Sequence, residues 1–343
     1  MKDIPDESIH AVITSPPYPM IAMWDNLFAR LSADVAKALA REDGNRAFEL
    51  MHSELDLVWV EAGRVLVPGG FACINMGDAT RTLAKRFALY PNHSRIEMKF
   101  LSLGFDVLPR IIWQKTTNAP NKFMGSGMLP AGAYVTLEHE YILVFRKKGR
   151  RSFDTAFQKS RRQASSIFWE ERNAWYSDLW KESGVRQAMD NYAEKNLRKR
   201  SAAFPLEIPL RLVSMYSLIG DTVLDPFLGT GTTMTGCVAL ARNSMGMEID
   251  KEFCRQAQDR LASSLPLLGD CVQARLVRHA DFCANHIDSN SAKGYTNKWH
   301  GFKVKTQQER YLVVPQLLEI KSKDGRLTCA MHEMPAGSMK GWE

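Results

Sequence analysis

Short apolar runs alternate with longer segments of helical spacing along the first half of the chain. Between residues 45 and 66, apolar side chains such as Phe48, Met51 and Leu55 recur every three or four positions, which predicts an amphipathic helix. The sequence Pro68-Gly69-Gly70 should end this helix, since neither residue type favours its continuation. Runs of five to eight mainly apolar residues predict buried strands at 8–13, 71–75, 106–113 and 140–145.

The second half of the chain continues this alternation, which indicates a parallel or mostly parallel α/β sheet. The stretch 116–135 is rich in Gly, Pro and Asn and should form a large loop. From residue 269 to residue 343 the pattern weakens, and this C-terminal extension receives no predicted role. Strands are predicted at 221–224 and 244–247, and helices at 208–216 and 232–241.

Composition narrows the class of protein. The chain has 343 residues, of which 45% are hydrophobic and 24% charged, as in globular proteins. No run of 18 apolar residues occurs, and the six cysteines form no C-x-x-C pair, so we expect a cytoplasmic protein without membrane spans or disulfides. The histidines and cysteines show no metal-ligand spacing, and no metal is predicted.

The net charge of +7 suits a polyanionic partner, and its distribution is uneven. Segment 146–200 holds 15 Lys and Arg against 7 Asp and Glu, a difference of +8 that accounts for the whole excess. Cationic side chains there alternate with aromatic ones. Such a run is often only a solvated face, but it is also typical of nucleic-acid binding.

A glycine-rich turn follows the predicted strand 221–224. Glycines in Asp225-Pro226-Phe227-Leu228-Gly229-Thr230-Gly231-Thr232-Thr233 allow a ligand to approach the backbone closely. No lysine follows them, so the turn is not a P-loop, and only G-x-G of the dinucleotide fingerprint is present. Glu248 ends the next strand and is placed to accept hydrogen bonds from ribose hydroxyls.

A second turn, Ser15-Pro16-Pro17-Tyr18, closes the strand 8–13. In one parallel sheet this turn and Asp225 lie at the same edge. The Ser15 hydroxyl and the Pro16 carbonyl are two acceptors on a rigid turn and can hold an NH2 group. The ring of Tyr18 offers a flat face on which a base can stack.

From Ser8 to Phe253 the chain resembles the DNA amino-methyltransferases of restriction–modification systems, in the permuted order with the catalytic motif before the cofactor motif. The turn at Asp225 matches the family form D-P-F-x-G-x-G-T-T. Ser15 to Tyr18 matches the catalytic motif, and serine at its first position, preceded by Thr14, resembles the cytosine-N4 subgroup.

This resemblance implies a doubly wound, mostly parallel, seven-stranded α/β sheet with a target-recognition insertion. It implies two halves of one methyltransferase domain, catalytic at 1–145 and cofactor-binding at 201–268, separated by a target-recognition region at 146–200 that acts with the loop 116–135. The implied cofactor is S-adenosylmethionine, and the residues implied to bind it are Asp225, Pro226, Phe227, Gly229, Gly231, Thr232, Glu248 and Phe204.

The implied reaction transfers a methyl group to N4 of a cytosine flipped out of double-stranded DNA. Ser15, Pro16, Pro17 and Tyr18 are the implied catalytic residues, with the ring rather than the hydroxyl of Tyr18 expected to matter. Methylation would protect a short sequence from a cognate restriction endonuclease acting on the same site, and residues 118–137 resemble enzymes of short palindromes such as CTAG. The predicted DNA contacts are Arg146, Lys147, Lys148, Arg150, Arg151, Arg161 and Arg162.

Three other functions compete with this interpretation. Adenine-N6 methylation is the nearest, because the first position of the catalytic motif separates the two subgroups imperfectly. A DNA-binding protein without catalysis and a nicotinamide oxidoreductase are the others, and the missing third glycine argues against the latter. Cytosine-C5 methylation is excluded, since no Pro-Cys occurs in the chain.

Overall fold

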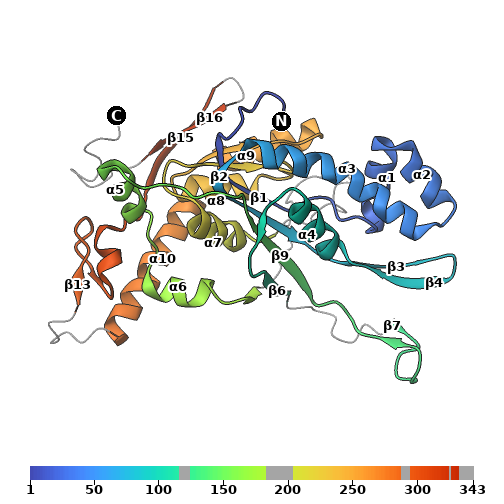
Figure 1. Cartoon of the computed structure of the whole chain (residues 1–343). Coiled ribbons are helices and arrows are strands. Elements are labelled where there is room, and N and C mark those ends of the chain that lie inside the picture. Colours follow the sequence, from blue (N-terminus) through green and yellow to red (C-terminus); the bar gives the residue numbers. More distant parts are fainter. Residues whose placement is uncertain (116–123, 183–203, 287–293, 324–325, 332–343) are drawn as a thin grey trace.

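A mixed α/β sheet organises the computed structural model, which describes residues 1–115, 124–182, 204–286, 294–323 and 326–331. Over these residues the main sheet has eight strands, seven of them in the order β10-β6-β9-β2-β1-β11-β12, with the short β5 beside β9 (Figure 1). The strands are β1 (Ile9–Thr14), β2 (Leu66–Met76), β5 (Asp106–Val107), β6 (Ile111–Lys115), β9 (His139–Arg146), β10 (Leu179–Glu182), β11 (Thr222–Asp225) and β12 (Asn243–Gly246).

Strand direction is uniform except at one place. β9 is antiparallel to β2, β5 and β6, and the other neighbouring pairs are parallel. The mostly parallel α/β sheet predicted from the alternation is therefore confirmed. Because β1 and β11 are parallel neighbours, their carboxyl ends lie together although Thr14 and Asp225 are 211 residues apart. Because β9 runs in the reverse direction, the segment that follows it starts at the edge of the sheet opposite the carboxyl ends of β1 and β11.

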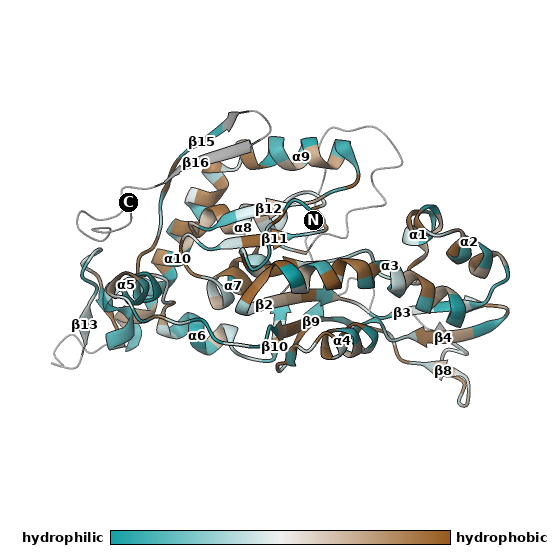
Figure 2. Ribbon diagram, turned by 45° about the horizontal axis from the view of Figure 1, so that its top comes forward, coloured by the Kyte–Doolittle hydropathy of each residue, from teal (hydrophilic) through white to brown (hydrophobic). Residues whose placement is uncertain are grey.

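Helices cover both faces of the sheet, and alternate side chains of each strand face each layer. In β1, Val12 packs with residues of α3 and α4, whereas Ala11 and Ile13 pack with residues of α7 and α8. The helix α10 also contributes Leu268 to the second layer. Figure 2 shows the apolar surfaces of the helices turned toward the strands. The helices of these layers are α3 (Gly44–Val65), α4 (Asn92–Ser102), α7 (Glu207–Tyr216), α8 (Thr232–Ala239), α9 (Lys251–Ala262) and α10 (Leu265–His286).

Smaller elements lie at the two ends of the sheet. The helices α1 and α2 and the hairpins β3–β4 and β7–β8 lie at one end, and α5, α6 and β13 lie at the other (Figure 1). Their bounds are η1 (Ala22–Trp24), α1 (Asp25–Leu31), α2 (Ala33–Ala40), β3 (Ala79–Leu83), β4 (Arg86–Tyr90), β7 (Met124–Gly125), β8 (Ala133–Tyr134), α5 (Ala156–Ala164), α6 (Trp169–Trp175), β13 (Tyr295–Thr296), β14 (Lys303–Val304), η3 (Gln307–Tyr311), β15 (Leu317–Lys323) and β16 (Arg326–Met331).

Several predicted boundaries are wrong. The strand expected at 71–75 begins at Leu66, directly after α3, and the strand expected at 106–113 is two strands, β5 and β6. Within the expected loop 116–135, the described part contains the hairpin β7–β8, whereas 116–123 lies outside the described residues. α10 (Leu265–His286) spans the expected domain boundary at 268/269, and its Leu268 is buried in the core. No described helix is both long and apolar enough to cross a membrane.

Candidate active site

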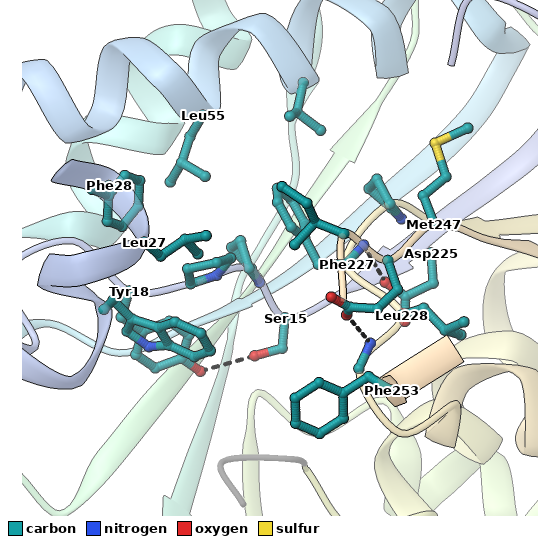
Figure 3. A pocket seen from close by; sticks show the side chains of 18 of the residues that line it. Ser15, Tyr18, Leu27, Phe28, Leu55, Asp225, Phe227, Leu228, Met247 and Phe253 are labelled. Atoms are coloured by element: carbon teal, nitrogen blue, oxygen red, sulfur yellow. Dashed lines mark hydrogen bonds between the residues drawn. The ribbon is translucent and has the colours of Figure 1, made fainter. Parts of the chain in front are cut away.

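A pocket of about 710 Å³ opens where β1 and β11 end. The turn after β1 and the loop after β11 form facing walls, and Figure 3 shows Ser15 and Tyr18 on one side and Asp225, Leu228 and Phe253 on the other. All the residues predicted for catalysis and all but one of those predicted for the cofactor line it. These lining residues are Ser15, Pro16, Pro17, Tyr18, Phe204, Asp225, Pro226, Phe227, Gly229, Thr232 and Glu248.

The loop after β11 is held by its own backbone and by one carboxylate. Gly229 and Gly231 have φ values of +51° and +79°, a region that glycine enters without strain. Glu248 accepts a hydrogen bond from the Gly229 N–H at 3.0 Å and another from the Asp250 N–H at 3.0 Å. Gly231, the exception, does not line the pocket. It precedes α8, where a Cβ would lie 3.0 Å from that of Ala257.

Asp225 joins the two walls. Its buried carboxylate accepts a hydrogen bond from the hydroxyl of Thr14, the last residue of β1, and from the Phe227 N–H at 3.1 Å. Burial raises the pKa of Asp225 to about 6, although these hydrogen bonds oppose the rise. The carboxylate therefore fixes the loop against β1 as well as lining the pocket.

The turn after β1 belongs to a polar network that the sequence did not indicate. The Tyr18 hydroxyl donates to Glu140 Oε2 at 2.9 Å, accepts from Asn75 Nδ2 at 2.8 Å and lies 3.2 Å from Ser15 Oγ. Asn75 Nδ2 also donates to Glu140 at 2.7 Å, and Lys115 pairs with the same carboxylate. Burial and the Glu140 carboxylate raise the pKa of Tyr18, so its hydroxyl keeps its proton.

This network sets the direction of each hydrogen bond. An ionised Glu140 only accepts, so Tyr18 gives its single proton to Glu140. Ser15 must then donate to Tyr18 Oη, and its Oγ, which accepts a long hydrogen bond from Asn75 Nδ2 at 3.4 Å, keeps one lone pair free to accept. Glu140 is a polar residue near the start of the mainly apolar β9, and Asn75 follows three buried residues of β2. A polar residue in an apolar strand does not by itself identify a site residue, so the sequence did not reveal these two.

A helical wall that sequence reasoning also missed closes one side of the pocket. Leu27 and Phe28 of α1 and Leu55 of α3 line it (Figure 3), and Leu31 of α1 lines it as well. The position of α1 is fixed by a two-pronged ion pair between Asp25 and Arg81 of β3, at 2.7 and 2.6 Å. The pocket thus has an apolar wall of the kind that a planar, weakly polar ligand fills.

The predicted DNA contacts of segment 146–162 lie elsewhere. Because β9 is antiparallel, this segment begins at the edge of the sheet opposite the pocket. Arg151 and Arg161 bind the buried Asp221, which precedes β11. The other five predicted contacts are Arg146, which pairs with Asp106, Lys147, which pairs with Glu7, and the exposed Lys148, Arg150 and Arg162.

The structure therefore does not bring these seven residues to the pocket. The part of the expected recognition region at 183–200 lies outside the described residues. In the described part of the chain, no group of three or more His, Cys, Asp or Glu side chains is arranged to hold a metal ion.

Comparison with known proteins gives consistent matches. Residues 9–259 match the family model N6_N4_Mtase, described as DNA methylase. The type II methyltransferase M.MthZI of Methanothermobacter thermautotrophicus is 49% identical over 90% of this chain and 86% of its own length. M.MjaI of Methanocaldococcus jannaschii is 49% identical over 74% of this chain and 85% of its own length. A candidate DNA modification methylase of Thermus thermophilus, whose structure was solved with S-adenosyl-L-methionine, is 31% identical. The match covers 77% of this chain and 90% of that one, with a TM-score of 0.59.

Proposed function

Since the chain belongs to the N6_N4_Mtase family of DNA methylases, it is a DNA methyltransferase that uses S-adenosylmethionine, and we propose that it methylates N4 of cytosine within a short recognition sequence of double-stranded DNA. The observation that carries the proposal is the pocket in which Ser15 faces the loop of Asp225 and Gly229. One wall suits a nucleoside-bearing cofactor, and the other suits an amino group.

The cofactor wall fits S-adenosylmethionine in its chemistry. Glu248 supplies carboxylate oxygens for ribose hydroxyls at the end of β12, and Gly229 allows the ligand to approach the backbone. Phe204 and Phe253 line the pocket as apolar rings. When bound, S-adenosylmethionine supplies a methyl group activated by the positively charged sulfur.

The catalytic wall acts by positioning. The lone pairs of Ser15 Oγ and of the Pro16 carbonyl accept the two hydrogens of the amino group and turn its nitrogen toward sp3 geometry. The nitrogen lone pair then points across the pocket toward the wall of Asp225. Transfer is direct, the methylated nitrogen releases one proton to water, and Ser15 forms no covalent bond. Positioned acceptors of this kind contribute through orientation and electrostatics rather than through acid–base exchange.

The choice of cytosine-N4 over adenine-N6 rests on Ser15, because serine at the first position of the catalytic motif resembles the cytosine-N4 subgroup. A serine hydroxyl accepts an amine hydrogen only when its own proton points elsewhere, and the Tyr18–Glu140 pair directs it away. Both target bases carry an amino group and both must leave the helix, so the pocket shape supports them equally. A cognate restriction endonuclease and a palindromic site such as CTAG are part of the same proposal.

The decisive experiment combines two readouts from a host that expresses the chain. Mass spectrometry of hydrolysed DNA should detect N4-methylcytosine, and sequencing should map it to one short motif. Detection of N6-methyladenine instead would overturn the proposed base, and the absence of both would overturn the activity. Calorimetry should show that Gly229→Val, which places a β-branched residue at a φ of +51°, no longer binds S-adenosylmethionine while the chain stays folded.

A further inference from the structure

A second cavity lies at the end of the sheet opposite the active site. It is a groove of about 1280 Å³ between the turn after β9, α5, α6 and the end of α7, and we call it the basic groove. Among the residues that the structure describes, six cationic side chains line it and no Asp or Glu does, although two of the six form ion pairs with carboxylates outside the lining. The six are Arg146, Arg150, Arg151, Lys159, Arg162 and Arg172.

Four of these cations have no carboxylate partner among the described residues. Arg146 and Arg151 are paired with Asp106 and Asp221, which lie outside the lining. The remaining four, Arg150, Lys159, Arg162 and Arg172, are exposed and form no ion pair with a described residue. Like charges gathered without counter-charges repel one another, so an anion that joins them relieves this repulsion and is attracted to the groove.

Aromatic rings hold two of the guanidinium groups. The guanidinium of Arg162 lies over the Phe153 ring with 4.6 Å to its centroid, and that of Arg172 lies over Tyr176 at 5.4 Å. A ring orients a guanidinium without cancelling its charge, unlike a carboxylate. The groups are therefore preorganised to donate forked hydrogen bonds to phosphate.

We propose that the basic groove binds the phosphate backbone of a second DNA segment, separate from the one that carries the target base. The elements that line the groove and those that line the pocket are separated: α5 and α6, which line the groove, lie at the opposite end of the molecule from α1, which lines the pocket (Figure 1). Contacts from arginine to phosphate carry no sequence information, so this second site would retain the enzyme on DNA without selecting a sequence.

The test asks whether enzyme already loaded with one duplex binds another. The enzyme is saturated with a duplex of about one helical turn, about 10 base pairs, that carries the mapped target. A longer, labelled duplex without the target is then titrated by fluorescence anisotropy at several salt concentrations. The variant is Arg162→Gln/Arg172→Gln, and the control Lys2→Gln/Arg278→Gln removes the same charge at exposed positions that line neither cavity.

The loaded parent and the control should bind the second duplex with a steep salt dependence. The variant should bind it at least about tenfold more weakly at low salt, with the slope of log K against log salt reduced by about two. No second binding by the parent, or equal slopes in parent and variant, would overturn the proposal, and an acidic protein would then be the better partner for the groove.

Methylation of the short duplex separates this proposal from the proposed function. All three proteins should methylate it at equal rates. If the parent fails to methylate, the assigned base or site is wrong, whatever the anisotropy shows. If only the variant fails, the groove belongs to the target-bearing DNA, and the separate second site is refuted.

Discussion

The Tyr18 hydroxyl can be removed without its ring, and Tyr18→Phe therefore tests the network beside the target amine. The substitution deletes the donor to Glu140 at 2.9 Å and the acceptor facing Ser15 Oγ at 3.2 Å. Glu140 keeps Asn75 and Lys115 as partners, so its carboxylate loses one hydrogen bond but is not left without a partner. Loss of one hydrogen bond to a charged group should lower the free energy of unfolding by about 1–3 kcal/mol.

The catalytic effect follows from Ser15. Without Tyr18 Oη, the Ser15 proton is free to turn toward the target amine, where it opposes the acceptor role. A neutral hydrogen bond of about 0.5–1.5 kcal/mol corresponds to methyl transfer about 2- to 10-fold slower. Stacking on the retained ring should leave capture of the flipped base nearly unchanged.

Single-turnover methyl transfer at saturating DNA and cofactor measures the rate, and 2-aminopurine fluorescence beside the target reports base flipping. Tyr141→Phe is the matched control, because Tyr141 neighbours Glu140 on β9 and packs by its ring against His93. Parent-like stability and rate in Tyr18→Phe would show that only the ring of Tyr18 matters and would refute the directional role of the hydroxyl.

Three further predictions follow from the same wall and from the cofactor loop. Ser15→Ala should slow single-turnover methyl transfer by about 10- to 1000-fold with DNA and cofactor affinity nearly intact, and a parent-like rate would leave the turn only a structural role. Gly77→Ala should slow transfer several-fold, since its Cβ would lie 3.0 Å from Tyr18 Cε2 and 3.2 Å from Glu140 Cγ. Gly269→Ala should not, since in the described part of the chain no atom outside its own helix and chain neighbours would lie within 4 Å of the added Cβ; equal rates in assays of both variants would contradict this. Burial raises the pKa of Asp225 from 3.8 to about 6, so the folded state holds the extra proton and the free energy of unfolding should fall, by at most about 3 kcal/mol, as pH rises from about 4 to about 6. Urea titrations at several pH values should show this decline in the parent and not in Asp225→Asn. If the free energy of unfolding changed with pH in the same way in both proteins, the raised pKa of Asp225 would be refuted.

The sequence predicted the central part of the fold and both walls of the pocket. Local signals were sufficient there, because Pro16-Pro17 and the glycines at 229 and 231 restrict the backbone by themselves, and apolar strands lead into both turns. The parallel alternation then placed Ser15 and Asp225 at one edge, and the structure brings them to one pocket.

The contacts that the sequence did not reveal depend on register and strand direction. Glu140 meets Tyr18 only because β9 runs antiparallel beside β2, which no local pattern specifies. The same reversal sends the chain after Arg146 to the far edge, which is why the basic run does not reach the pocket. Charge counts gave the composition of that run but not the side of the sheet on which it emerges.

The neighbouring positions of β1 and β11 have a consequence for folding during synthesis on the ribosome. β1 leaves the exit tunnel about 210 residues before its partner β11. At about 5–20 residues per second, that interval lasts about 10–40 s. Once β2 has emerged as well, β1 has β2 on one side and an unpaired, apolar edge on the other, which can pair with another nascent chain. Each copy of the enzyme therefore passes through a period in which it is inactive and prone to aggregate, and rapid translation or a chaperone that covers this edge should raise the yield of active protein.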